Sequence, residues 1–132
     1  MEIKKVAYEN FRNIAEAEVA FTPGTNVLWG NNAQGKTNIL EGIYFFARGK
    51  SFRASSDRET VRFGEQCARA ELTFRRAASA RETVLEAYIP ASGKKKLFRS
   101  GAPLSGVSEM IGDFTAVLFC PEHLSLVSRS PA

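Results

Sequence analysis

The sequence predicts an α/β fold for this chain of 132 residues. A short apolar stretch ends in a glycine and leads through polar residues into a helical pattern, LWGNNAQGKTNILEGIYFF at 28–46. Short segments of alternating apolar and polar residues on both sides of this stretch indicate strands. Hydrophobic residues make up 44% of the chain, which is enough for the core of one domain. The chain has no apolar run long enough to span a membrane, and no signal peptide is expected.

The first half should contain strands at 3–8 and 17–21, separated by a polar turn. Residues 25–29 are apolar enough for a third strand that is buried on both faces. The helix is expected to begin near Lys36 and to end before Gly49, a candidate C-terminal cap. Helical spacing predicts its apolar face to consist of Ile39, Leu40, Ile43, Tyr44, Phe46 and Ala47.

A polar loop at 50–59 separates this helix from a second group of strands. The segments RAELTF and TVLEAYI alternate well enough to form an antiparallel pair. The expected elements are strands at 60–63, 68–75, 83–89 and 96–99, a short helix at 103–111, an apolar strand at 115–120 and a weak helical pattern at 121–132.

Residues 30–37, GNNAQGKT, match the phosphate-binding pattern G-x-x-x-x-G-K-[ST] without a mismatch. Glycines allow backbone N–H groups to approach a phosphate closely, and the positive end of the following helix favours an anion. Lys36 would reach the β- and γ-phosphates, and the Thr37 hydroxyl would bind Mg²⁺. The alternative is an ordinary glycine-rich turn. The predicted loop residues are Gly30, Asn31, Asn32, Ala33, Gln34, Gly35, Lys36 and Thr37.

The strings NFRNI at 10–14, GNNAQGKTNILEGIYFFARGKSFR at 30–53 and AVLFCPEHLSLVSRSPA at 116–132 together resemble the RecF family. This family consists of bacterial recombination-repair ATPases related to the SMC and Rad50 proteins. The resemblance extends over the whole chain, which would correspond to the N-terminal part of the family's sequence. It implies lobe I of an ABC-type ATPase head, in which a P-loop α/β core carries an antiparallel β layer.

The resemblance also implies the roles of residues outside the loop. Asn38 would assist at the phosphates, Arg12 and Asn13 would border the nucleotide, and Arg53 would approach the phosphates from an arginine-bearing loop. For Arg12 and Arg53 the alternative is a solvated arginine. Ala33 departs from the family pattern, because relatives often have glycine there, but a methyl group is tolerated where φ is negative.

The family implies an ATP- and Mg²⁺-dependent protein of the bacterial cytoplasm and nucleoid. It would bind single-stranded or gapped DNA as an ATP-dependent homodimer and help other repair proteins to load recombinase. Its ATPase activity would be weak and would depend on dimerisation. The acidic Asp-Glu strand end and the SGG signature that hydrolysis needs are absent from 1–132. We therefore expect no catalytic residue here, and ATP binding without turnover by this chain alone. The alternatives are a non-catalytic interaction domain with a retained P-loop and, less well supported, a small-molecule phosphotransferase.

The positive charge of the chain is concentrated in one segment. The net charge is +4. Residues 75–99 contain seven basic and two acidic residues, or 7 − 2 = +5, which leaves 4 − 5 = −1 for the remainder. Lys94, Lys95, Lys96 and Arg99 lie in or beside a predicted turn and are candidate DNA contacts through phosphate. The alternative is a solvated turn.

Overall fold

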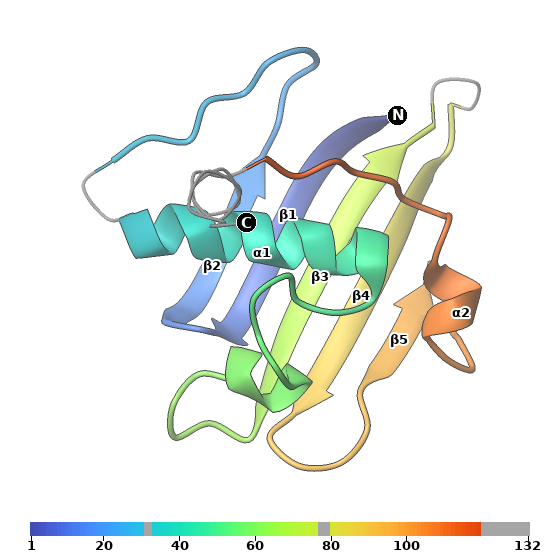
Figure 1. Ribbon diagram of the computed structural model, residues 1–132. Coiled ribbons are helices and arrows are strands. Elements are labelled where there is room, and N and C mark those ends of the chain that lie inside the picture. Colours follow the sequence, from blue (N-terminus) through green and yellow to red (C-terminus); the bar gives the residue numbers. More distant parts are fainter. Residues whose placement is uncertain (31–32, 77–79, 120–132) are drawn as a thin grey trace, which may run out of the picture.

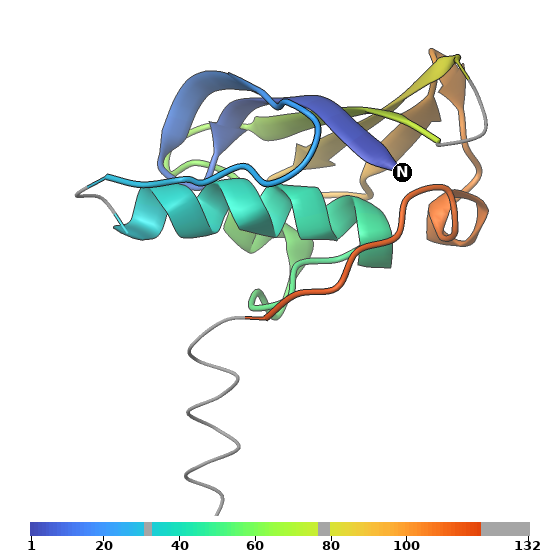
Figure 2. The ribbon, with the colours of Figure 1, turned by 90° about the horizontal axis from the view of Figure 1, so that it is seen from above.

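The computed structural model describes residues 1–30, 33–76 and 80–119. Six antiparallel strands form one sheet in the order β2-β1-β3-β4-β5-β6. Figure 1 shows the long helix α1, Ala33–Arg48, crossing the sheet, and Figure 2 shows the helix and the sheet as two layers. The strands are β1 Glu2–Phe11, β2 Ile14–Ala20, β3 Cys67–Arg75, β4 Glu82–Pro90, β5 Lys96–Arg99 and β6 Ala102–Pro103. The short helices are the 3-10 helix η1, Asp57–Thr60, and α2, Val107–Met110.

The core lies between the sheet and α1. Alternation along the strands places every second residue on the helix side, and the register aligns these residues into rows. One row contains Val19, Val6, Leu72 and Leu85, and the next contains Tyr8, Ala70, Ala87 and Leu97. The helix contributes Phe45 and Phe46, both fully buried, to the same cluster. This arrangement confirms the antiparallel layer and the predicted pairing of β3 with β4.

Helix α1 begins three residues earlier than predicted, at Ala33, and its buried face is rotated from the predicted one. Leu40, which was expected in the core, is 41% exposed, and Glu41 is completely buried. Gly42 is also buried, and it packs so closely on Tyr8 that an added Cβ would lie 2.2 Å from the Cε1 atom of that ring. The predicted cap is confirmed: Gly49 has φ +78°, and its N–H donates to the Phe45 carbonyl at 2.6 Å.

For two apolar segments, the prediction of a strand is wrong within the described structure. Residues 25–29 and 115–119 have irregular backbone, and Val27, Trp29, Val117 and Phe119 are between 73% and 86% exposed. A strand requires a neighbour that satisfies its backbone hydrogen bonds, and none of the described strands pairs with either segment. Cys120 and the helical pattern predicted at 121–132 lie outside the described residues.

Smaller differences concern the loops. The expected strand at 60–63 is absent, because η1 ends at Thr60 and Val61 makes only an isolated bridge to Phe11. The expected helix at 103–111 is reduced to α2, and β6 precedes it. Among the helices of the described part of the chain, none is long and apolar enough to cross a membrane.

Candidate nucleotide-binding site

The turn between β1 and β2 presents Arg12 and Asn13. Arg12 has a left-handed backbone, with φ +55°, which a residue with a side chain rarely adopts. Two backbone hydrogen bonds hold this turn and the end of β1 against the last residue of η1 and the segment that follows it. The Arg12 N–H donates to Thr60 at 2.7 Å, and the Arg62 N–H donates to Asn10 at 2.8 Å. The turn is therefore fixed against this segment, and its side chains have a defined direction.

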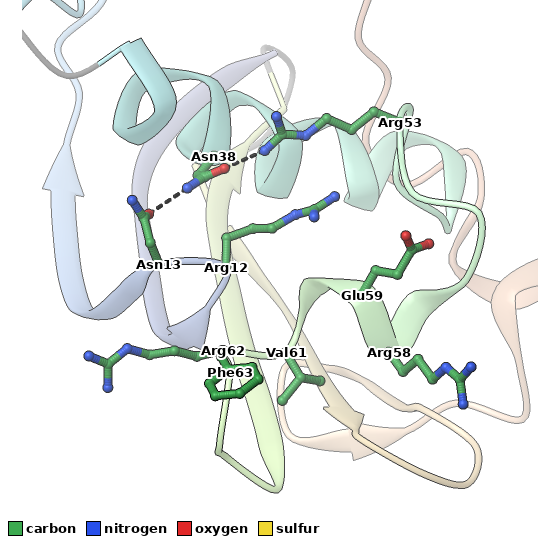
Figure 3. Close-up of a pocket in the computed structure, with 9 residues that line it drawn as sticks. All are labelled: Arg12, Asn13, Asn38, Arg53, Arg58, Glu59, Val61, Arg62 and Phe63. Carbon is green, nitrogen blue, oxygen red and sulfur yellow. Dashed lines mark hydrogen bonds between the residues drawn. The ribbon is translucent and has the colours of Figure 1, made fainter.

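Helix α1 holds this turn through Asn38. The buried Asn38 amide donates from Nδ2 to Oδ1 of Asn13 at 2.6 Å, and Asn38 Oδ1 accepts from Nη2 of Arg53. Figure 3 shows the three side chains in a continuous line from the β1–β2 turn to the loop after α1. Three of the residues that the family resemblance singled out, far apart in sequence, are thus directly connected.

The carboxylate of Glu41 lies one helical turn further along and has no exposed surface. It receives a two-pronged contact from Arg12, with Nε to Oε1 at 2.9 Å and Nη2 to Oε2 at 2.7 Å. Arg53 Nη2 donates to Oε1 at 3.1 Å, and the Ser51 hydroxyl donates to Oε2. Burial raises the pKa of Glu41, but the hydrogen bonds from Arg12, Arg53 and Ser51 outweigh it, so the net pKa lies below its ordinary value.

Ser51 determines the turn that the backbone makes in the KSFR segment at 50–53. The Ser51 Oγ accepts the backbone N–H groups of Arg53 and Ala54, each at 3.0 Å, so it closes a tight turn. Phe52 contacts the Tyr44 ring edge-on, with the ring centroids 5.9 Å apart. These contacts attach the loop to α1 and bring the Arg53 side chain towards Asn38 and Glu41.

An open pocket of about 960 Å³ lies beside this network. Four predicted residues line it together: Arg12, Asn13, Asn38 and Arg53. Its other lining residues, which the sequence analysis missed, are Arg58, Glu59, Val61, Arg62 and Phe63. The lining contains four arginines and one acidic residue, so the pocket favours an anion, while Val61 and the fully exposed Phe63 add apolar surface.

The predicted phosphate loop lies at the start of α1. Gly30 has φ +150°, Ala33 opens the helix, and Gln34, Gly35, Lys36 and Thr37 form its first turns. Lys36 Nζ donates to the Gly30 carbonyl at 2.7 Å. Asn31 and Asn32 lie outside the described residues. Lys36 and Thr37 do not line the pocket, but they directly precede Asn38, which does.

The residue types present fit a nucleoside triphosphate with Mg²⁺. Lys36, Arg12 and Arg53 supply cationic donors from one helix and two loops. The carboxylates that could repel an anion already accept hydrogen bonds: Glu41 from Arg12, Arg53 and Ser51, and Glu59 in the lining from Ser55 and Ser56. The helix N-terminus adds backbone N–H groups. For Mg²⁺ the described residues offer the hydroxyl of Thr37, and they contain no cluster of three His, Cys, Asp or Glu side chains.

The basic residues of the β4–β5 region differ in their surroundings. Lys94 and Lys96 are exposed. Lys95 Nζ contacts Asp57 Oδ2 at 2.5 Å and the Gly49 carbonyl at 3.0 Å, so its charge ties η1 to the end of α1. Arg99 contacts Asp113 at 2.5 Å. Lys95 and Arg99 therefore have structural partners that the sequence did not reveal.

Glu41 and Ser51 are two further functional candidates that sequence reasoning missed, beside the five lining residues above. Asn38, Glu41 and Phe45 are spaced three and four residues apart and so share one helix face, and all three are buried. The sequence signal that could have found the network was a polar and a charged residue on the same helix face as an apolar one. If that face is buried, the carboxylate requires a cationic partner. Nothing in the sequence identified which arginines supply it.

Known structures place this architecture in one class. The fold resembles a solved structure of the recombination mediator protein RecF-ATP in the RecFOR pathway, with a TM-score of 0.85 and 34% identity over 95% of this chain and 34% of that chain. It also resembles an SMC ATPase, with a TM-score of 0.81 and 19% identity, which supports the fold alone. The sheet, the loop and α1 thus define part of a P-loop ATPase head.

A family model described as AAA ATPase domain matches residues 1–97, and the chain belongs to this family. Curated relatives are named DNA replication and repair protein RecF, which confirms the resemblance noted in the sequence. Those of Lacticaseibacillus casei and Clostridium acetobutylicum are both 39% identical, over 100% and 99% of this chain respectively. The chain spans 35% and 36% of the length of these two relatives.

Proposed function

We propose that this chain is the ATP-binding part of a DNA replication and repair protein. The observation that carries the proposal is the convergence of Arg12, Asn13, Asn38 and Arg53 on one pocket at the helix that the phosphate loop opens. The loop residues Gly30 to Thr37 would hold the phosphates, with Lys36 as a point charge and Thr37 as a Mg²⁺ ligand. Val61 and Phe63 would contact the apolar parts of the nucleotide.

When bound, Mg²⁺ would neutralise charge on the phosphates and orient them. The residues of this chain then have separate tasks. Lys36 and Arg53 offset negative charge, Asn38 keeps Arg53 and the Asn13 turn in place, and the start of α1 provides the positive end of its dipole. Hydrolysis in the whole protein would be weak and would require dimerisation, as in the family that the sequence resembles.

Calorimetric titration of Mg-ATP into the full-length protein tests the proposal. Lys36→Ala should abolish measurable binding, because the variant loses the ammonium group that contacts the phosphates. Lys96→Ala removes an exposed lysine from β5 and serves as the matched control. Binding that is equal in the wild type and in Lys36→Ala would reject the site. Binding without DNA-dependent turnover would favour the alternative of a non-catalytic interaction domain.

We propose further that the whole protein binds single-stranded or gapped DNA as an ATP-dependent dimer, together with other repair proteins. Of the candidates Lys94, Lys95, Lys96 and Arg99, the exposed Lys94 and Lys96 support this best. Replacing both by Glu should weaken DNA binding at low salt. The slope of log K against log salt concentration should fall by about the contribution of two phosphate contacts. Unchanged affinity, relative to Lys50→Glu at an exposed position in the loop after α1, would exclude this surface.

A further inference from the structure

Glu41 is the point at which three separate segments meet. It belongs to α1, whereas its partners Arg12 and Arg53 come from the β1–β2 turn and the loop after the helix. Ser51 contributes the fourth hydrogen bond from that same loop. Both carboxylate oxygens therefore accept two hydrogen bonds each. A buried carboxylate with this many donors has a fixed orientation, and it fixes its donors in return.

The direction of the two arginines gives this network a role beyond stability. A guanidinium group carries five N–H donors in a planar fork. Arg12 uses its Nε and Nη2 edge on Glu41, and Arg53 uses Nη2 on Glu41 and Asn38. Among the described residues, Nη1 of neither arginine has a hydrogen-bond partner, which leaves it for other contacts. Both residues line the pocket, and their side chains keep 23% and 26% of their surface exposed.

We propose that Glu41 is a positioning residue of the nucleotide pocket, which holds Arg12 and Arg53 so that their remaining N–H groups face the phosphates. This inference rests on the proposed function. Glu41 itself has no surface in the pocket, so it acts only through the two arginines. It also couples the β1–β2 turn to the arginine loop, because one carboxylate accepts hydrogen bonds from both.

The sign of the effect of Glu41→Gln separates positioning from simple electrostatics. Removal of a negative charge beside an anion site should strengthen ATP binding if only long-range charge mattered. If the carboxylate orients the arginines, the variant should bind ATP more weakly, because an NH2 donor replaces one oxygen and the amide can no longer accept both prongs of Arg12 together with Ser51. AMP has one phosphate instead of three and should be affected less.

The test is the ratio of ATP to AMP affinity in the full-length protein, measured by calorimetry at a temperature where every variant is folded. Glu41→Gln should lower this ratio by about 10-fold, since hydrogen bonds to charged groups contribute about that factor. Glu71→Gln is the matched control, because Glu71 pairs with Arg69 on the sheet face away from α1. This control should leave the ratio unchanged.

A double variant provides the second arm. In an Arg12→Ala, Arg53→Ala background, Glu41→Gln should produce no further change in the ratio, because the residues through which it acts are gone. An unchanged or raised ratio in Glu41→Gln alone would overturn the inference and leave the proposed function intact. Absence of ATP binding by the wild type would overturn both. A uniform loss of ATP and AMP affinity would assign Glu41 a structural role and also overturn the inference.

Discussion

At the scale of single residues, the site depends on polar groups that lie in the core. Asn38 and Glu41 are 2% and 0% exposed, and burial of such groups is costly unless each is hydrogen-bonded. In the described residues no buried side-chain nitrogen or oxygen lacks a partner. The network around Glu41 therefore stabilises the fold and also determines the direction of the arginines.

The Glu41 network predicts a defined pH dependence of stability. The net pKa of Glu41 is lowered in the folded protein, so its contribution is fully present above the unfolded carboxyl pKa and is lost as the pH falls through the folded pKa. The difference in unfolding free energy between wild type and Glu41→Gln should be constant near neutral pH. It should shrink below a pH of about 4.5, the reference pKa of the carboxyl group.

Urea denaturation at a series of pH values measures this difference for the two proteins. The other glutamates with lowered pKa values are present in both proteins, so their contributions to the pH dependence cancel in the difference. They are Glu2, Glu59 and Glu109. A difference that grows as the pH falls would contradict the ion-paired state of Glu41.

At the scale of the elements, α1 is the part that organises the site. Its N-terminal turns carry the loop residues, and Asn38 and Glu41 attach the two flanking segments. The helix is itself fixed on the sheet through Tyr8. The Tyr8 hydroxyl donates to the Ile39 carbonyl at 2.7 Å, and its ring lies against Gly42. A displacement of α1 on β1 would therefore move every residue of the pocket that it anchors.

This close contact predicts the effect of Gly42→Ala. Alanine is the better helix former by about 1 kcal/mol, but its Cβ would lie 2.2 Å from Cε1 of the fully buried Tyr8. The clash should dominate and lower the unfolding free energy by about 1–3 kcal/mol, as measured by urea denaturation.

The Tyr8→Leu background is the control, because a smaller side chain relieves the clash. There Gly42→Ala should be far less harmful, which a double-mutant cycle would show as coupling. Equal effects in both backgrounds would mean that the Tyr8 ring is not the obstacle.

At the scale of the whole molecule, the sheet and α1 bury one core, whereas two apolar segments remain uncovered. Val27, Trp29, Val117 and Phe119 belong to segments 25–29 and 115–119, and all four are largely exposed. Figure 2 shows both segments outside the sheet, on the side where α1 lies. Exposed apolar groups of this size favour association with other surfaces. The predicted phosphate loop at 30–37 directly follows the first of these segments.

Trp29 is the single tryptophan of the chain and reports on this segment. At 86% exposure its fluorescence should be quenched by acrylamide nearly as well in the folded chain as in the same chain unfolded in urea. A folded chain with strongly protected tryptophan fluorescence would contradict the exposed conformation of residues 25–29.

Trp29→Ser together with Phe119→Ser should reduce self-association in sedimentation experiments, because both changes remove exposed apolar surface.

Local pattern alone determined much of this protein. The alternation in β3 and β4 and the cap at Gly49 depend on neighbours in sequence, so they were predictable. The phosphate-binding role of the motif at 30–37 stays a prediction. The tertiary structure decided what depends on distant partners. It left 25–29 without a neighbouring strand, buried Glu41 in place of Leu40, and joined Arg12 to Arg53 across forty-one positions of sequence. Hydrogen-bond partners and packing are properties of contacts in space, and one-dimensional spacing does not specify them.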